Sequence, residues 1–340
     1  MGNLNLITII VNGEKDEEIN ILFNEFEPLP NYIYINNDFN EVEGENSVKL
    51  PREGDNIIEM IWVNSLNSCE NMFQGCDSII SIDLSDFDSS IILYTQCMFS
   101  GCFSLKSVDF ENFITSNVQN MNGMFSGCMN LESIDMSHFI TTKVEDMSYM
   151  FSDCISLKSL NLSSFNTSRV KKIVGMFSNC EALSSLQINN FDTLYVTSMS
   201  YMFDGCKSLT SLDLSNFLTN SNKYMDSMFS KCSKLNSLNI SNFFTNNLIN
   251  MNSMFYDCSS LKKLDMANFI TSNLNDKASI FDNCKNIKYM NLLNYVDKDI
   301  FTSIPNYNDL SICINDYSQI KDEQNSLREN NVPNKYGFNV

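Results

Sequence analysis

A cysteine recurs every 26 residues, nine times in succession, and this period constrains the fold more than any other feature of the chain. Each cysteine ends a related pentapeptide, from Met72–Cys76 to Ile280–Cys284. The series is Cys76, Cys102, Cys128, Cys154, Cys180, Cys206, Cys232, Cys258 and Cys284. A fixed period of about 20 to 50 residues is the signature of stacked structural repeats. We therefore predict a solenoid, in which no insertion between coils provides room for an active site.

Two periodicities alternate within one coil. Val108-Asp109-Phe110 alternates apolar and polar residues, which predicts a short strand with its middle side chain facing outward. Val118, Met121, Met124 and Phe125 are spaced by three and four, which predicts a helical or 3₁₀ turn with one buried face. Thr115-Ser116 precedes this turn and would supply a hydroxyl N-cap. The predicted fold class is a solenoid with a short parallel β-strand and a helical or 3₁₀ turn in each coil.

The columns of the repeat are regular. A Phe lies eleven residues after almost every cysteine, and the residue before it is Asn in six coils. Those six are Asn112, Asn190, Asn216, Asn242, Asn268 and Asn294. We interpret them as a structural ladder, because an Asn side chain can satisfy backbone groups of neighbouring coils. His138, the only histidine, replaces Asn in this column and is interpreted as a tolerated substitution.

The ends of the chain do not follow the repeat. We predict a β-rich N-terminal cap over residues 1–55, a solenoid over 56–295 whose first coil, around Ile57–Trp62, is degenerate, and a C-terminal cap over 296–340. The cap strands are expected at Leu4–Val11, Ile19–Phe26 and Tyr32–Asn36, with a hairpin at Asn12-Gly13. The C-terminal cap is expected to contain a strand at Leu310–Asn315 and a helix at Gln319–Asn330.

One coil carries Met202, Phe203, Cys206, Leu209, Leu212, Leu214 and Phe217, and the other coils carry the same residue types at these positions. In these residues the coil resembles the BspA-like leucine-rich repeat, and more closely its DUF285-type variant, the mycoplasma lipoprotein-associated repeat. The resemblance covers about residues 56–295. It implies a leucine-rich-repeat-like solenoid, display on a cell surface, and binding to host or neighbouring-cell proteins.

The nine aligned cysteines favour buried free thiols. They form a line with one thiol in each coil, whereas zinc ligands converge on one point and usually come in CxxC pairs, which this chain lacks. Stacked parallel thiols also suit disulfide geometry poorly. Disulfides and a metal site are the less favoured alternatives, and we expect no metal and no cofactor.

The outward position of the predicted strand forms a polar stripe, with serines beside it. Its members are Asp83, Asp109, Asp135, Asn161, Gln187, Asp213, Asn239, Asp265 and Asn291. They are the candidate ligand-binding face, since repeat proteins commonly bind along such surfaces. A merely solvated sheet face is an equally open interpretation, because the stripe lacks the Tyr, Trp and Arg typical of binding hot spots. Calcium bound along the Asp positions is a weaker alternative.

Composition excludes several function classes. The net charge is −19, and residues 1–55 hold 12 Asp and Glu against 3 Lys and Arg, so we expect no nucleic-acid partner. With one His and no phosphate-binding loop, no nucleophile–base arrangement can be assembled, and we expect a protein that is not an enzyme. No signal peptide or transmembrane segment is visible, so we expect no membrane insertion. We expect a monomer.

These observations leave the function open between two main hypotheses. The first is a surface recognition or adhesion protein, which the family resemblance favours. The second is an intracellular interaction scaffold, which the missing export signal and the reduced cysteines favour. A structural protein that associates end to end is a third. Asn161, Asn166 and Asn239 lie in glycosylation sequons, and glycans on them would mark the secretory route.

Overall fold

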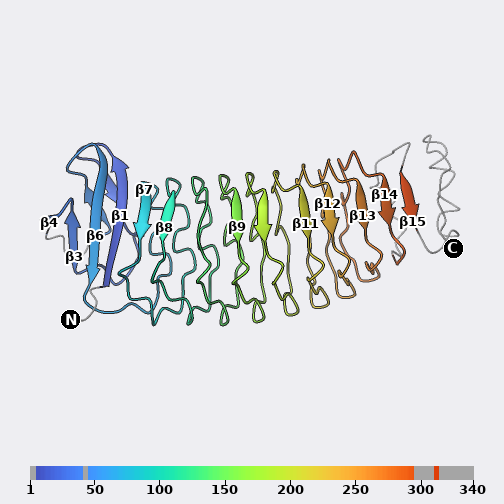
Figure 1. The fold of residues 1–340 in the computed structure, drawn as a ribbon, viewed down its shortest axis with the longest axis horizontal. Helices are drawn as coiled ribbons and strands as arrows, with labels where there is room; N and C mark the ends of the chain where they lie inside the picture. The colour runs from blue at the N-terminus through green and yellow to red at the C-terminus, as the bar shows by residue number, and fades with distance from the viewer. Residues whose placement is uncertain (1–4, 41–44, 295–309, 314–340) are drawn as a thin grey trace. The chain divides into compact units, whose positions relative to one another are not determined.

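The computed structural model describes residues 5–40, 45–294 and 310–313 (Figure 1). The chain divides into two compact units, Met1–Arg169 with Asn179–Ile188, and Val170–Ser178 with Asn189–Val340. Each contains coils of about 26 residues, so each is a β-solenoid segment. Within the described ranges all regular secondary structure is strand, and none of it is a helix. Consequently no described helix has the length and apolarity needed to cross a membrane.

The first unit begins with a mixed sheet in which antiparallel strands cover the first coil (Figure 1). Its strands, in spatial order, are β4 (Asp38–Asn40), β3 (Tyr32–Ile35), β6 (Gly54–Trp62), β1 (Asn5–Gly13), β7 (Ile79–Asp83) and β8 (Ser107–Asp109). Strand β1 pairs antiparallel with β6 on one side and with β7 on the other. Its side chains alternate, with Ile7, Ile9 and Val11 fully buried. The first coil strand therefore has a hydrogen-bonded neighbour on its outer edge.

Two sequence-based predictions for this region are wrong. Strand β1 runs through Asn12-Gly13 without a hairpin, and β2 (Glu18–Asn20) instead pairs with β5 (Ser47–Lys49). Ile57–Trp62 is not a degenerate coil, because it lies in β6, antiparallel between β1 and β3. A nine-residue alternating strand pairs along its whole length with another of nine residues, and this pairing outweighs the local turn signal.

Within each unit the coil strands are short, parallel and in register. In the first unit β7 pairs with β8, and β9 (Ser159–Asn161) pairs with β10 (Ser185–Gln187). In the second unit β11 (Ser211–Asp213) pairs with β12 (Ser237–Asn239). Strand β13 (Lys263–Asp265) pairs with β14 (Tyr289–Asn291), which pairs with β15 (Ser311–Cys313).

The predicted C-terminal strand Leu310–Asn315 contains β15, whereas the predicted helix Gln319–Asn330 lies outside the described residues. The domain boundaries at 55/56 and 295/296 stay predictions.

The predicted helical or 3₁₀ turn is replaced by a chain of separate turns. In the coil of Cys128, the amides of Met124, Ser126 and Cys128 each bond the carbonyl three residues earlier. The alternate amides bond the next coil instead, as Phe125 does to the Met150 oxygen at 2.9 Å. The spacing by three and four is therefore real, but every second amide serves the stack, so a continuous helix cannot form.

Left-handed backbone explains the Gly of the repeated pentapeptide. In every coil φ is positive at two positions, one and five residues before the cysteine. In most coils the residue directly before the cysteine is Gly, Asn or Asp, as at Gly101 (φ 75°) and Asn179 (φ 57°). These residues tolerate the left-handed region, which costs other L-residues about 1–2 kcal/mol. The conformation also interrupts any right-handed helix over the turn.

The buried threonines link coils rather than cap helices, so the predicted N-cap role is wrong. Thr115 Oγ1 accepts a hydrogen bond from the Ile140 amide at 2.8 Å and donates one to the Ile140 carbonyl at 3.1 Å. In the second unit Thr245 does the same for Ile270. One hydroxyl thus satisfies both backbone groups of a residue in the next coil.

The core consists of stacked columns. In the first unit the rings of Phe73, Phe99, Phe125 and Phe151 stack with centroid separations of 5.2 to 5.8 Å. In the second unit Phe177, Phe203, Phe229, Phe255 and Phe281 stack at 5.5 to 5.8 Å. The Asn ladder is confirmed, since Asn112 donates to the Ser85 carbonyl and Asn268 to the Ser241 carbonyl, each 27 residues earlier.

One core column contains a polar exception. Sixteen residues after the cysteine, the coils carry Val118, Val144, Val196 and Leu248, all buried, but Asn222 occupies this position in the coil of Cys206. Asn222 is fully buried, and neither its amide nitrogen nor its amide oxygen has a hydrogen-bond partner. A buried polar group without partners costs about 1–3 kcal/mol.

We predict that Asn222→Val stabilises the protein by about 1–3 kcal/mol, because it removes this desolvation cost and restores the apolar column. The measurement is urea unfolding at neutral pH. The matched control is Val196→Asn, the reverse change in the preceding coil of the same unit, which should destabilise by a similar amount. A neutral or destabilising effect of Asn222→Val would contradict the buried, unpartnered placement.

Candidate functional site

The predicted binding face is a strip of exposed residues at the ends of the coil strands. Every member is exposed except Asn291, which is partly buried. Strand register places them in neighbouring pairs: Asp83 with Asp109 and Asn161 with Gln187 in the first unit, and Asp213 with Asn239 and Asp265 with Asn291 in the second. Asp135 follows a segment without an assigned strand. The face is therefore present in each unit, in line with the coil strands.

A local structural role accounts for the residue types on this face. Asp83 Oδ1 accepts a hydrogen bond from the Ser85 amide at 2.9 Å, and Asp109 Oδ1 accepts one from the Glu111 amide at 2.9 Å. The same bond, to the amide two residues on, is made by Asp135, Asn161, Asp213, Asn239, Asp265 and Asn291. These are Asx turns, which end each strand and turn the chain. Asp and Asn perform this role equally well.

The turns also affect ionisation. The Ser137 amide holds the pKa of the Asp135 carboxyl below its usual range, helped by the Ser137 hydroxyl and opposed by slight desolvation. The Ser215 amide lowers the pKa of Asp213 in the same way. Both carboxylates are therefore charged at neutral pH.

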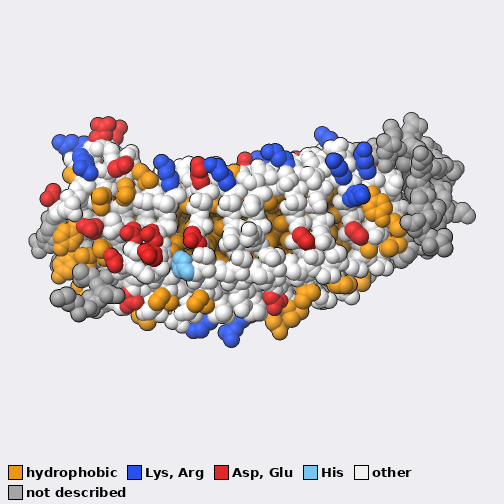
Figure 2. All heavy atoms as spheres, viewed as in Figure 1, with side chains coloured by type: hydrophobic (Ala, Val, Ile, Leu, Met, Phe, Trp, Pro, Cys, Tyr) orange, Lys and Arg blue, Asp and Glu red, His pale blue; other side chains and the backbone are white. Residues whose placement is uncertain are grey.

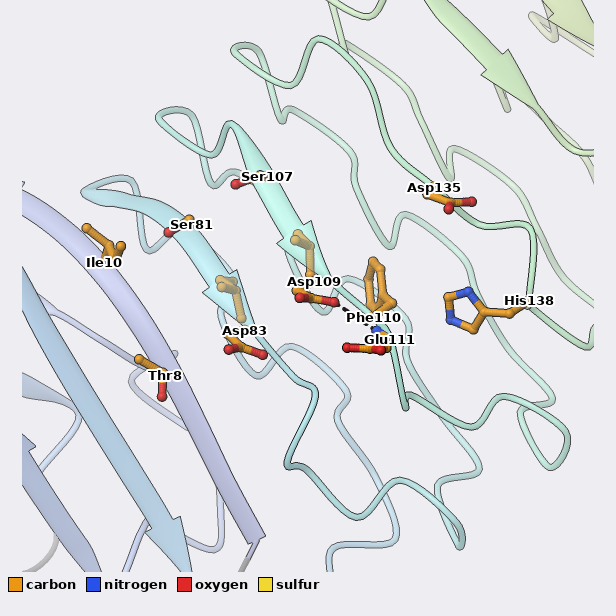
Figure 3. Close-up of a pocket in the computed structure, with 12 residues that line it drawn as sticks. Thr8, Ile10, Ser81, Asp83, Ser107, Asp109, Phe110, Glu111, Asp135 and His138 are labelled. Carbon is orange, nitrogen blue, oxygen red and sulfur yellow. Dashed lines mark hydrogen bonds between the residues drawn. The ribbon is translucent and has the colours of Figure 1, made fainter.

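The first unit has a hollow of about 810 Å³ over this face, between β1 and the coil of Cys128 (Figure 3). Its lining includes the apolar residues Ile10, Ile82, Val108 and Phe110 together with four carboxylates. The carboxylates belong to Asp83, Asp109, Glu111 and Asp135. Asp83 and Asp109 lie on adjacent strands, and Figure 3 shows their side chains on the same side of the sheet.

Sequence reasoning found three of these carboxylates and missed the other contributors. Glu111 and His138 lie just after the strand ends, and both also line a second hollow of about 980 Å³ in this unit. Thr8 and Ile10 come from the N-terminal sheet, which the repeat pattern does not include. The His138 ring lies edge-on to Phe139 at 5.2 Å. Their position in the sequence could have revealed Glu111 and His138, since residues two to three after each Asx residue share the same edge of the face.

The cysteine series lies in the core, and the prediction of free buried thiols is confirmed. Each thiol from Cys102 onward donates to the carbonyl of the Phe 29 residues earlier, as Cys180 does to Phe151 at 3.1 Å. Burial raises the pKa of Cys76 and of Cys284 to about 12. The thiols are therefore protonated donors, and thiolate chemistry is suppressed. Among the described residues no cluster of three His, Cys, Asp or Glu could hold a metal ion.

Register, coil length and side-chain ladders together define a leucine-rich-repeat-like β-solenoid. A family model described as "Mycoplasma protein of unknown function, DUF285" matches residues 67–187 and 173–294. The chain belongs to this family, whose repeats are of the BspA type. Repeat solenoids of this kind are typically binding scaffolds, and the family resemblance indicates an interaction role.

Comparisons with solved structures and with curated proteins add no functional information. A solved structure titled "Crystal structure of TLR13-ssRNA13 complex" is similar over 74% of this chain and 49% of that one, at 17% identity and a TM-score of 0.21. The chain spans about half the length of that protein. No curated protein matches the chain.

We predict that Asp213→Asn leaves stability at neutral pH almost unchanged, whereas Asp213→Ala lowers it by about 0.5–1 kcal/mol, because only Ala removes the turn acceptor. Since the folded-state pKa of Asp213 is lowered, its charge-dependent stabilisation exists above the unfolded pKa and is lost as pH falls through the folded value. Asp213→Asn should therefore lose less stability on acidification than the wild type. Urea unfolding at neutral and acidic pH measures both effects. Equal losses in the Ala and Asn variants would contradict the turn assignment.

We predict that the protein loses stability steeply above the usual thiol pKa of about 8.5. Burial raises the pKa of Cys180 well above that value, so its contribution is complete below the unfolded pKa and is lost as pH rises toward the folded one. Cys180→Ala should reduce the loss between about pH 7.5 and 10 by up to about 2 kcal/mol. Urea unfolding with a reductant measures this. Ser152→Ala, which removes another buried side chain that does not titrate, should leave the pH dependence unchanged.

Proposed function

We propose that this protein recognises another protein along the exposed sheet face, as a surface recognition or adhesion protein. The observation that carries the proposal is that each unit has a column of exposed Asp, Asn, Gln and Ser side chains along its coil strands, and that in the first unit members of this column line a hollow with apolar and acidic residues. Membership of a repeat family built for stacking supports a binding role over a catalytic one.

The face suits a protein ligand better than a small molecule. The lining of the hollow in the first unit combines buried or partly buried apolar side chains with exposed carboxylates, a combination typical of protein contacts. Flanking serines such as Ser107 and Ser185 are exposed and small, so a partner backbone can approach the sheet closely. Asx turns hold the strand ends in fixed positions, which lowers the ordering cost of binding.

We predict that crosslinks from the face identify one partner, and that Ser107→Arg/Ser133→Arg weakens its binding about tenfold or more, because long side chains then block the sheet. The measurement is photo-crosslinking from positions 107 and 133 in native cells, followed by calorimetry with the purified partner. The matched control is Asn130→Arg/Thr142→Arg, which adds the same charge at exposed positions away from the strands. Equal affinity of both variants would overturn the proposal.

An experiment on the same cells distinguishes a surface protein from an intracellular one. Protease treatment of intact cells should cleave a surface protein. Full protection would favour the alternative, an intracellular interaction scaffold, while leaving the binding face itself in place.

A further inference from the structure

Five lysines gather on one edge of the second unit, where each coil passes from its cysteine to its strand. They are Lys234, Lys262, Lys263, Lys285 and Lys288, and all are exposed. The same segments, residues 233–237, 259–263 and 285–289, contain no Asp or Glu. Figure 2 shows Lys and Arg side chains gathered over β12 and β13. We name this set the lysine edge, a basic patch on a chain of net charge −19.

The lysines lie close together because the coils stack. The Lys288 amide donates to the Lys262 carbonyl at 2.8 Å, and Lys263 pairs in register with Tyr289. Adjacent strands are about 4.8 Å apart, so the ammonium groups repel one another. Among the residues that the structure describes, none of these five side chains has an ion pair or a hydrogen bond. A ligand with several carboxylates would remove this repulsion.

A surface of matching chemistry lies on the first unit. The hollow there has four exposed carboxylates, Asp83, Asp109, Glu111 and Asp135, which we name the acidic hollow. One oxygen of each Asp is engaged in its Asx turn, and no described Lys or Arg pairs with any of the four. The two surfaces therefore carry opposite charge, stacked at the same coil spacing.

We propose that the lysine edge of one copy binds the acidic hollow of a second copy of this chain. The inference rests on the proposed binding face, because the second copy would occupy the end of that face in the first unit. Since the two surfaces differ, the contact is heterologous and joins copies head to tail. At about 0.1 M salt the Debye length is about 10 Å, so the net repulsion between copies is screened while close ion pairs persist. This replaces the expectation of a monomer.

The test uses purified full-length protein and two complementary variants in sedimentation velocity. Lys262→Glu/Lys285→Glu/Lys288→Glu reverses the lysine edge and keeps the hollow. Asp83→Asn/Asp109→Asn/Asp135→Asn/Glu111→Lys removes all four carboxylates of the hollow and adds one positive charge, keeps the Asx acceptors, and leaves the lysine edge intact. The matched control for charge is Lys15→Glu/Lys49→Glu/Lys106→Glu, at exposed lysines of the first unit.

The expected result is association of the wild type and of the control at about 0.1 M salt, reversed at about 0.5 M. Each complementary variant alone should be monomeric. An equimolar mixture of the two should form dimers and nothing larger, because only one intact pair of surfaces remains.

A monomeric wild type at about 0.1 M salt, or a mixture that stays monomeric, would overturn the inference. Binding of fluorescent poly-glutamate to the lysine edge of a monomeric wild type would likewise overturn it, and would assign the edge to an acidic segment of another protein. Neither result bears on the proposed function. That function is tested separately, by calorimetry of the Ser107→Arg/Ser133→Arg variant with the crosslinked partner.

Discussion

Hydrogen bonding from one coil to the next is the constraint on which this structure depends. The coil strands have three to five residues and no helix is described, so most backbone groups cannot be satisfied within their own segment. Every second amide of the turns, the Thr hydroxyls, the Cys thiols and the Asn amides bond residues 25 to 29 positions away. The 26-residue period is therefore a hydrogen-bonding requirement as much as a packing one, since any insertion would shift all four ladders at once.

The period was enough to predict the stack, the buried thiols, the Asn ladder and the outward strand positions. It failed at the turn before each cysteine, where a spacing of three and four is shared by a helix and by successive single turns. Gly, Asn or Asp one residue before the cysteine was the signal for left-handed backbone, as Gly101 and Asn179 show. The prediction of the N-terminal sheet was wrong for another reason. Pairing between β1 and β6 depends on contacts about 50 residues apart, which no local pattern reveals.

The candidate face could be located from the sequence, but its function could not be predicted from it. Asp and Asn occur there because their side-chain oxygen closes an Asx turn, which explains the column without any ligand. Asp and Asn are interchangeable for that purpose, and they differ only in charge. The turn therefore does not decide whether a coil carries Asp or Asn. Three consecutive coils carry Asp at one hollow, and turn geometry does not require that charge.

The same reasoning applies to the lysine edge. The segment between each cysteine and its strand needs one buried apolar residue three positions after the cysteine, as at Leu261, and its other side chains face solvent. Solubility alone would be served by either sign of charge, and the rest of the chain is strongly acidic. Five lysines without an acidic residue among these segments oppose that trend and cost electrostatic repulsion within the stack. Structural requirements thus set the ladders, while charge varies at positions that the ladders leave free, and both proposed binding surfaces lie at such positions.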